Sequence, residues 1–339
     1  MRPAFILSLL LASLLPAQEP SPKKPSGSRP PRIVRPGVST PGVKRAIETI
    51  KPLAEISIPG VPDWQVVTSD SLWVSNGPKN TLHRIDAKSN QQSATIPVGT
   101  RPCSGLAAGF GSIWVPLCGA RGTGEGKGLA RVDIKTNQVI ATIPVGPADS
   151  EGGLTTSKDA VWIVSDPKGV LTRIDPKTNK PVAEITIPAG SVAAHFAAGF
   201  VWVTANKASK LIQIDAKKNA VVREIEVGPS PRFLTSGAGS VWTVNQGDGS
   251  VTRVDAKSGA IQAKIEAGIP GPGGELSFGG GGLWITVFDI PITFIDPKTN
   301  TVTKQWTGPG GDAIRYGHMS VWLSNLRQQN LWRIDPKTL

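Results

Sequence analysis

Short hydrophobic runs alternate with turn residues from about residue 53 to residue 339. Seven of these runs contain a Trp, and successive Trp residues lie 38 to 48 positions apart. An apolar run that ends in Asp follows each Trp. A repeat of about 40 residues built from strands and turns is typical of β-propeller blades. The Trp residues are Trp73, Trp114, Trp162, Trp202, Trp242, Trp284 and Trp322, and the Asp residues are Asp86, Asp133, Asp175, Asp215, Asp255, Asp296 and Asp335.

Each repeat divides into four short strands. In the fifth repeat, Gly, Asn and Asp turns separate strands expected at 232–236, 241–245, 251–255 and 260–266. Leu171 and Ile174 lie three positions apart in one third strand, so both faces of that strand carry apolar side chains. Blades that pack face against face around a ring bury both faces. The pattern predicts an all-β fold over residues 52–339, a seven-bladed β-propeller of four-stranded blades.

The last repeat lacks its fourth strand, because only four residues follow Asp335. Residues 53–59 (LAEISIP) closely match residues 182–188 (VAEITIP), the expected fourth strand of an internal blade. We therefore expect the N-terminal segment to complete the seventh blade and close the ring.

The first 51 residues differ in composition from the repeats. Residues 1–17 have a basic start, an apolar stretch at 4–15 and a Pro-Ala exit, which predicts a signal peptide and a periplasmic or secreted protein. The apolar stretch is shorter than the roughly 20 residues of a membrane span. Residues 18–51 predict a disordered, Pro-rich linker.

The linker carries much of the positive charge. Nine of the 37 Lys and Arg residues precede residue 52, against two of the 25 Asp and Glu residues. Binding to nucleic acid or to an anionic surface is one interpretation of this charge. A solvated linker is the simpler one, and we expect no specific nucleic-acid partner.

Cys103 and Cys118 flank the first hairpin expected in the second repeat, which places them opposite each other. In an exported protein this arrangement predicts a disulfide.

Polar residues that differ from blade to blade mark one end of the predicted channel. The loops that enter the innermost strands meet there, and these loops do not repeat one another although the blades do. An asymmetric ligand requires such divergence, and loops on a rigid scaffold commonly carry function. The candidate binding residues in these loops and at the adjoining inner strands are Asp63, Trp64, Ser104, Glu151, His195, Arg232, Glu275, Asp312 and Arg315.

The loops between second and third strands share this end and add Asn245, Gln246 and Asp248. Two interpretations of the carboxylates stay open. Glu151, Glu275 and Asp312 are candidate oxygen ligands for Mg²⁺ or Ca²⁺, or the carboxylates pair with Arg232 and Arg315. Trp64 is expected at the rim, as a stacking platform for a ligand or as hydrophobic packing.

The repeats SVWTVNQGDGSVTRVDAKSG and AVWIVSDPKGVLTRIDPKTNKPVAEITIPAG resemble the YVTN-type β-propeller repeats of exported bacterial proteins. They are also similar to a wider group that includes virginiamycin B lyase and gluconolactonase-like propellers. The resemblance covers about residues 53–339. The similarity to the YVTN-type proteins implies an exported propeller with a binding role.

The lyase resemblance implies a Mg²⁺ site with His and Glu residues at the central mouth. His195 would be the general base and Glu275 its partner, with Glu151 and Asp312 nearby. A gluconolactonase-like site would instead use Glu151, Asn245, Asp248 and Asp312. The chain departs from the lyase pattern because its blades lack a PDGNLWFTE-like signature and its mouth has a single His.

These observations favour a monomeric binding module that holds a small molecule, a peptide or a partner protein at the mouth. The alternatives are a metal-assisted lyase or lactonase centred on His195 and Glu275, and a purely structural envelope scaffold. The enzyme would lose turnover in a folded His195→Ala variant, whereas the binding module would lose affinity.

Overall fold

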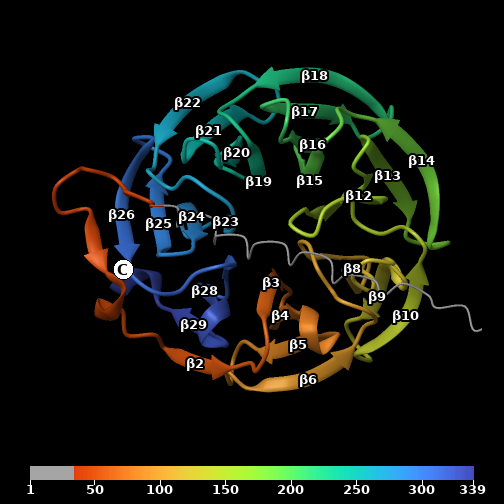
Figure 1. Ribbon diagram of the computed structural model, residues 1–339, viewed down its shortest axis with the longest axis horizontal. Helices are drawn as coiled ribbons and strands as arrows, with labels where there is room; N and C mark the ends of the chain where they lie inside the picture. Colours follow the sequence, from red (N-terminus) through yellow and green to blue (C-terminus); the bar gives the residue numbers. More distant parts are fainter. Residues whose placement is uncertain (1–33) are drawn as a thin grey trace, which may run out of the picture. The chain divides into compact units, whose positions relative to one another are not determined.

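The computed structural model describes residues 34–339, which form a ring of seven β-sheets (Figure 1). The predicted signal peptide and residues 18–33 of the predicted linker lie outside the described residues. Each sheet contains four antiparallel strands, and the sixth has an additional parallel strand. No α-helix occurs among residues 34–339, and four short 3-10 turns complete the secondary structure. The prediction of an all-β, seven-bladed propeller is confirmed.

The blades follow one another along the chain, and each runs from an innermost to an outermost strand. The strands of blades 1 to 3 are β3 (Pro62–Val67), β4 (Ser71–Asn76), β5 (Thr81–Asp86), β6 (Gln92–Pro97), β7 (Ala107–Gly109), β8 (Ser112–Cys118), β9 (Lys127–Asp133), β10 (Gln138–Ile143), β11 (Leu154–Thr156), β12 (Val161–Asp166), β13 (Val170–Asp175) and β14 (Lys180–Thr186). Those of blades 4 and 5 are β15 (Ser191–Ala197), β16 (Phe200–Ala205), β17 (Lys210–Asp215), β18 (Ala220–Glu226), β19 (Pro231–Gly237), β20 (Ser240–Asn245), β21 (Ser250–Asp255) and β22 (Ile261–Glu266). In blade 5 the predicted strand bounds agree with these to within one or two residues.

Blades 6 and 7 each include a strand from the N-terminal segment. Blade 6 contains β23 (Glu275–Gly279), β24 (Gly282–Val287), β25 (Ile290–Asp296), β26 (Thr301–Thr307) and β1 (Lys44–Ala46). Blade 7 contains β27 (Ile314–Gly317), β28 (Ser320–Asn325), β29 (Asn330–Ile334) and β2 (Ala54–Ser57). Strand β2 pairs antiparallel with β29, with Ala54 opposite Arg333, and Ile58 just beyond it is fully buried. The N-terminal strand therefore closes the ring as the sequence predicts.

The structure differs from the predicted linker in residues 44–49. Strand β1 runs parallel to β26, and the 3-10 turn η1 (Ile47–Thr49) follows it. Ile47 packs in the same buried cluster as Trp306 of β26. Gln305, fully buried, accepts a hydrogen bond at 2.8 Å from the backbone N–H of Val38. This N-terminal segment therefore covers Trp306 at the outer edge of blade 6.

The repeated Trp residues are almost fully buried between blades, as their spacing predicts. In five blades, an Arg of the third strand lies over the Trp ring, with its guanidinium carbon 4.6–5.2 Å from the ring centroid. The same guanidinium donates a hydrogen bond to an Asn in the outer turn of the next blade. We call this contact the inter-blade bridge. Its pairs are Arg84–Asn137, Arg131–Asn179, Arg173–Asn219, Arg253–Asn300 and Arg333–Asn90.

The two joints without a bridge lack both partners. Between blades 4 and 5, Gln213 stands in place of the Arg and Gly259 in place of the Asn. Between blades 6 and 7, Phe294 packs against Trp284 at 4.5 Å between ring centroids, and the chain ends with Leu339 at the turn. At each joint the Arg and the Asn are thus either both present or both absent, as expected if their role is to hydrogen bond to each other.

The Asp that ends each third strand caps the next turn. In blade 2, the Asp133 carboxylate accepts hydrogen bonds from the backbone N–H groups of Lys135 and Thr136, at 2.9 and 2.8 Å. The same contact recurs in the other blades. Cys103 and Cys118 form the predicted disulfide, with their Cα atoms 5.9 Å apart. The remaining 3-10 turns are η2 (Gly77–Lys79), η3 (Leu326–Gln328) and η4 (Pro336–Thr338).

Candidate functional site

Two layers of side chains from the seven innermost strands line the central channel. The first layer contains one residue from each blade, the one that lies opposite the Trp in the strand pairing. We call this layer the channel ring. It consists of Val66, Ala107, Thr155, His195, Thr235, Ser277 and Arg315. The second layer lies two residues earlier, either on the same strand or in the segment that enters it. We call it the constriction ring, and it consists of Trp64, Gly105, Gly153, Ala193, Phe233, Glu275 and Ala313.

Two aromatic side chains of the constriction ring meet across the channel. Trp64 of blade 1 and Phe233 of blade 5 contact edge to face, with ring centroids 5.5 Å apart. Each is only 3% exposed. Small residues from blades 2, 3, 4 and 7 leave room for them, and a Cβ added to Gly105 would lie 3.6 Å from the Trp64 ring. Trp64 therefore closes the channel and is not at the rim, where the sequence analysis placed it.

A cavity of about 290 Å³ extends along the inner strands from this aromatic pair. Six members of each ring line it. In blade 4, Ala193 and Ala194 are buried whereas His195 and Phe196 are half-buried, and blade 5 shows the same change after Phe233. The channel therefore widens beyond the aromatic pair, towards the hairpins that join first and second strands.

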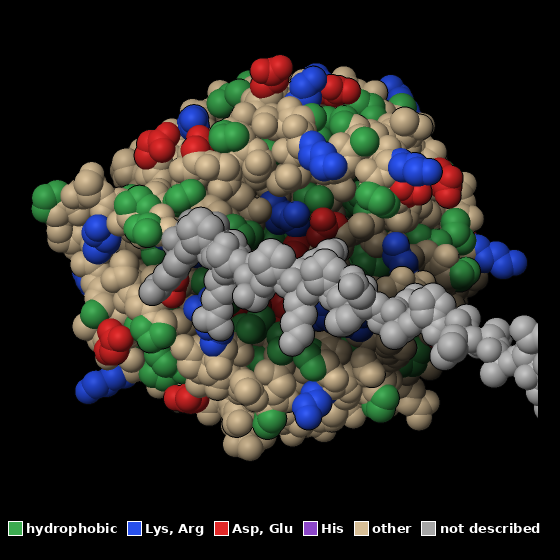
Figure 2. All heavy atoms as spheres, viewed as in Figure 1, with side chains coloured by type: hydrophobic (Ala, Val, Ile, Leu, Met, Phe, Trp, Pro, Cys, Tyr) green, Lys and Arg blue, Asp and Glu red, His purple; other side chains and the backbone are tan. Residues whose placement is uncertain are grey.

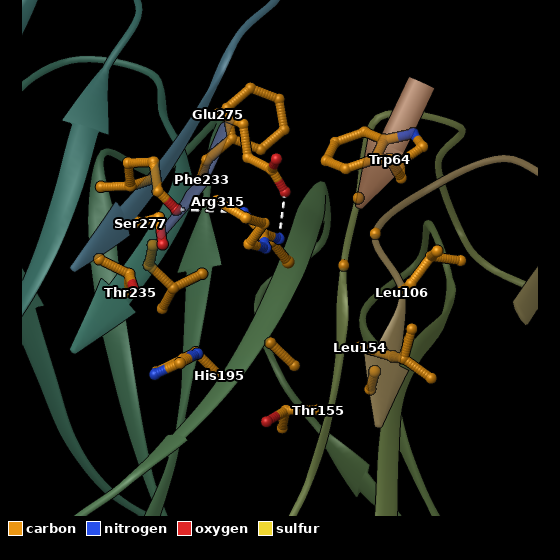
Figure 3. A pocket seen from close by; sticks show the side chains of 18 of the residues that line it. Trp64, Leu106, Leu154, Thr155, His195, Phe233, Thr235, Glu275, Ser277 and Arg315 are labelled. Carbon is orange, nitrogen blue, oxygen red and sulfur yellow. Dashed lines mark hydrogen bonds and ion pairs between the residues drawn. The ribbon is translucent and has the colours of Figure 1, made fainter. Parts of the chain in front are cut away.

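The cavity has one apolar and one polar side (Figure 3). Leu106 and Leu154 from blades 2 and 3 lie on one side, below Trp64 in the view. His195, Thr235, Ser277 and Arg315 from blades 4 to 7 lie on the other side, with Glu275 above Arg315.

His195 is a neutral hydrogen-bonding group of this cavity. Its Nε2 atom lies 2.8 Å from the hydroxyl of Ser236 on the neighbouring strand β19. Burial, followed by the positive charge of Arg315, lowers the pKa of His195 to about 4. The imidazole is therefore uncharged at neutral pH and can donate or accept a hydrogen bond.

Glu275 and Arg315 form a buried ion pair between blades 6 and 7. The second carboxylate oxygen of Glu275 accepts a hydrogen bond at 3.1 Å from the backbone N–H of Ile314. Burial nevertheless outweighs these contacts and raises the pKa of Glu275 to about 7. The Glu275 carboxyl can therefore gain or lose a proton close to neutral pH.

The mouth on the other side of the aromatic pair holds a separate acidic group. The carboxyls of Asp63 and Asp312 hydrogen bond to each other. Burial and mutual repulsion raise the pKa of Asp63 well above its usual value, and burial raises that of Asp312 to about 7. The pair therefore shares a proton at neutral pH.

Glu151 and Arg232 lie at the rim of the same mouth. Glu151 is exposed, and Arg232 pairs with Asp149 at 3.3 Å and donates to the Glu151 backbone carbonyl at the same distance. Asp63 and Glu151 also line a second cavity of about 470 Å³ beside the disulfide. Figure 2 shows acidic and basic side chains close together near the centre of the ring. Of the two Arg residues, Arg315 pairs with a candidate carboxylate, Glu275, whereas Arg232 pairs with Asp149, which the sequence analysis did not name.

Eight of the predicted site residues do not line the central cavity. Four of them, Asp63, Glu151, Arg232 and Asp312, belong to the mouth, and the other four make local contacts. Asn245 is fully buried and donates to Ser250 and Thr252 inside blade 5. Gln246 donates to the Gly273 carbonyl, and Asp248 pairs with Lys264 at 3.0 Å. Ser104 is buried, and its backbone N–H donates to the Ser150 carbonyl. Their contacts stabilise turns and the joint between blades 2 and 3.

The metal implied by the lyase resemblance does not fit these residues. Within residues 34–339, no three His, Cys, Asp or Glu side chains lie close enough to hold a metal ion together. Glu275 is paired with Arg315, His195 contacts Ser236, and Asp312 lies in the mouth beyond the aromatic pair. Glu151, Glu275 and Asp312 are thus not brought together as one ligand set.

The sequence analysis missed the hydroxyl residues Thr155, Thr235 and Ser277 and did not place Phe233 opposite Trp64. One available signal would have found the hydroxyl residues. They occupy the position that pairs with the Trp of their blades, and this position varies in chemistry while the Trp does not.

The fold resembles several solved propellers, although no protein-family model and no curated protein matches the chain. Virginiamycin B lyase from Staphylococcus aureus aligns with a TM-score of 0.69 and 15% identity, over 83% of this chain and 98% of that one. A streptogramin B lyase aligns at 0.67 and 16%, over 83% and 96%. Hydrazine synthase from Kuenenia stuttgartiensis aligns at 0.68 and 16%, over 85% and 98%. At these identities, the comparisons show a shared propeller fold.

Proposed function

We propose that this chain is an exported binding protein that holds a small molecule in its central cavity. One observation carries the proposal. The packing residues repeat from blade to blade, whereas the residues of the two rings that line the cavity do not. Within each ring only Gly, Ala and Thr occur in more than one blade. A purely structural ring has no use for a buried ion pair and a neutral His beside an open cavity, because burying charge is costly. The predicted signal peptide and the disulfide support export.

The metal-assisted lyase or lactonase has less support. Its proposed base, His195, and its proposed ligand, Glu275, are held by Ser236 and Arg315 within the polar side of the cavity. Partner binding at the mouth is supported by the exposed Glu151 and by the cavity of about 470 Å³ that Asp63 and Glu151 line, but the buried ion pair and the neutral His lie in the central cavity.

A cavity-filling variant tests the proposal. Ala107 belongs to the channel ring, so Ala107→Phe should fill the cavity, whereas Ala220→Phe on the exposed outer strand β18 is the matched control. We expect ligand-observed NMR to find small fragments that bind the native chain and the control, and that lose at least about tenfold in affinity with Ala107→Phe.

His195→Ala should also weaken these fragments while the melting curve stays cooperative. Fragments that bind all four proteins equally would contradict the proposed site, as would a complete lack of binding. Turnover of a cyclic ester that disappears in His195→Ala would instead favour the lyase.

A further inference from the structure

The cavity presents several hydrogen-bond donors to a ligand. The Ser277 hydroxyl oxygen accepts from the backbone N–H of Tyr316 at 3.0 Å, and the Thr155 oxygen accepts from that of Phe196 at the same distance. Among residues 34–339, neither hydroxyl donates a hydrogen bond to a protein acceptor. Because a backbone N–H already occupies each oxygen, the O–H groups are available to a ligand.

Arg315 adds a charged donor next to Ser277. Its Nη1 donates to the backbone carbonyls of Ile314 and Leu276, at 2.9 and 3.4 Å, and its Nη2 contacts Glu275. These contacts leave the Nε–H and one Nη2 hydrogen of the five guanidinium donors uncommitted. The Arg315 side chain is 21% exposed whereas that of Glu275 is 4% exposed. The cavity therefore faces the positive member of the pair more than the negative one.

The opposite side of the cavity can hold an apolar group. Leu106 and Leu154 line it, and their side chains present no polar atoms. A volume of about 290 Å³ has room for about ten non-hydrogen atoms, at roughly 30 Å³ for each water-sized group.

We propose that the ligand is a small carboxylic acid in its anionic form, with its carboxylate on Arg315 and Ser277 and its apolar body against Leu106 and Leu154. This inference rests on the proposed function and narrows it to a class of ligand. A guanidinium binds carboxylates through two parallel hydrogen bonds, and charge-assisted bonds of this kind are stronger than neutral ones.

The titration of Glu275 supports the inference. A bound carboxylate competes with Glu275 for Arg315, and the Glu275 pKa of about 7 lets this group take up a proton as the ligand binds. The other groups that face it are His195, which is neutral above pH 4, and the Asp63–Asp312 pair, whose negative charge favours the protonated Glu275.

Matched acids and amides test the inference by titration calorimetry at pH 6. The probes are acetate, isovalerate and phenylacetate, each with its primary amide of nearly identical shape. We expect at least one acid to bind about tenfold more tightly than its amide in the native chain. In a second titration at pH 8, where the Glu275 carboxylate is ionised, Glu275→Gln should increase that preference several-fold, since it removes the competing charge but keeps an acceptor for Ile314.

The double variant Glu275→Gln/Arg315→Gln should abolish the preference, and Arg232→Gln, which alters the Arg of the mouth, should preserve it. Amides that bind as tightly as the acids, or a double variant that still prefers acids, would overturn the carboxylate assignment and leave the proposed function standing. The carboxylate assignment also fails, and the proposed function stands, if none of the six probes binds while other fragments lose affinity with Ala107→Phe. If no fragment binds at all, the proposed function itself fails. A double variant that does not fold leaves the native chain and Glu275→Gln to decide.

Discussion

The carboxyls of Asp63 and Asp312 are held together at the mouth at a cost to the folded state. Each is desolvated, and two adjacent carboxylates cannot both ionise without repulsion. The folded pKa of Asp312, about 7, lies above its ordinary value of 3.8. The folded state therefore retains a proton that the unfolded state has lost. Stability from this group should fall as pH rises from about 4 to 7 and stay low above pH 7.

Asp312→Asn should remove this loss, because an amide can hydrogen bond to Asp63 without adding charge. We expect a higher melting temperature than that of the native chain at pH 8 and a clearly smaller difference at pH 5. Each pKa unit realised corresponds to about 1.4 kcal/mol, or roughly 2–4 °C for each kcal/mol in a large domain.

Asp248→Asn is the matched control, since its carboxylate pairs with Lys264 and hydrogen bonds lower its pKa. It should lose stability at pH 8. A melting temperature of Asp312→Asn that is no higher at pH 8 would contradict the shared proton.

At the scale of elements, neighbouring blades are joined by the inter-blade bridges as well as by apolar packing. Arg131 packs over Trp114 and donates to Asn179 of the next blade at 2.8 Å. Asn179 has a left-handed backbone, with φ of 57°. Because Asn and Gly adopt this conformation most readily, the turn can tolerate Gly where the Arg is missing, as it does at Gly259.

A double-mutant cycle of Arg131→Met and Asn179→Gly isolates the bridge. Asn179→Gly keeps the turn conformation and removes the acceptor. We expect a coupling free energy of about 1–2 kcal/mol in chemical unfolding, typical of a partly buried hydrogen bond to a charged group. The same cycle with Arg131→Met and Asn219→Gly, whose side chain accepts from Arg173 instead, should show almost none. Equal coupling in both cycles would contradict the bridge.

Strand β2 is the element that makes the ring continuous. Ile56 and Ile58 pack in one cluster with Trp322 and Leu331 of blade 7 and with Leu72 of blade 1. We expect deletion of residues 53–59 to abolish cooperative unfolding, because it exposes this cluster and the edge of β29.

Ile58→Asp is the milder change and should lower the melting temperature strongly, since it buries a charge. Ser57→Asp, exposed on the same strand, should leave it nearly unchanged. A sharp, unshifted melting curve after the deletion would refute closure by β2.

For the ring as a whole, regular packing surrounds an irregular interior. The Trp, Arg, Asn and Asp positions repeat around the circumference, whereas the two inner rings vary. The aromatic pair of Trp64 and Phe233 divides the channel into the mouth, with the acid pair, and the central cavity, with the ion pair. Binding at one compartment can therefore be separated experimentally from binding at the other by variants on either side of the pair.

The sequence by itself determined the number of blades, their strands, the closing strand and the disulfide. These features follow from local patterns: a Trp and an Asp at fixed spacing, turn residues between strands, and two Cys facing each other across one hairpin. It also determined which inner positions differ between blades, since alignment on the Trp reveals them.

Only the tertiary structure decided which of these positions meet. Trp64 reaches Phe233 because small residues at the same level leave space across the channel, and Glu275 pairs with Arg315 because adjacent blades bring them together. Asn245 and Asp248 belong to the same loop set as the mouth in sequence terms, yet their side chains are used within their own blade. Contacts across a ring depend on its radius and on the volume of every side chain at that level, and no local pattern encodes either.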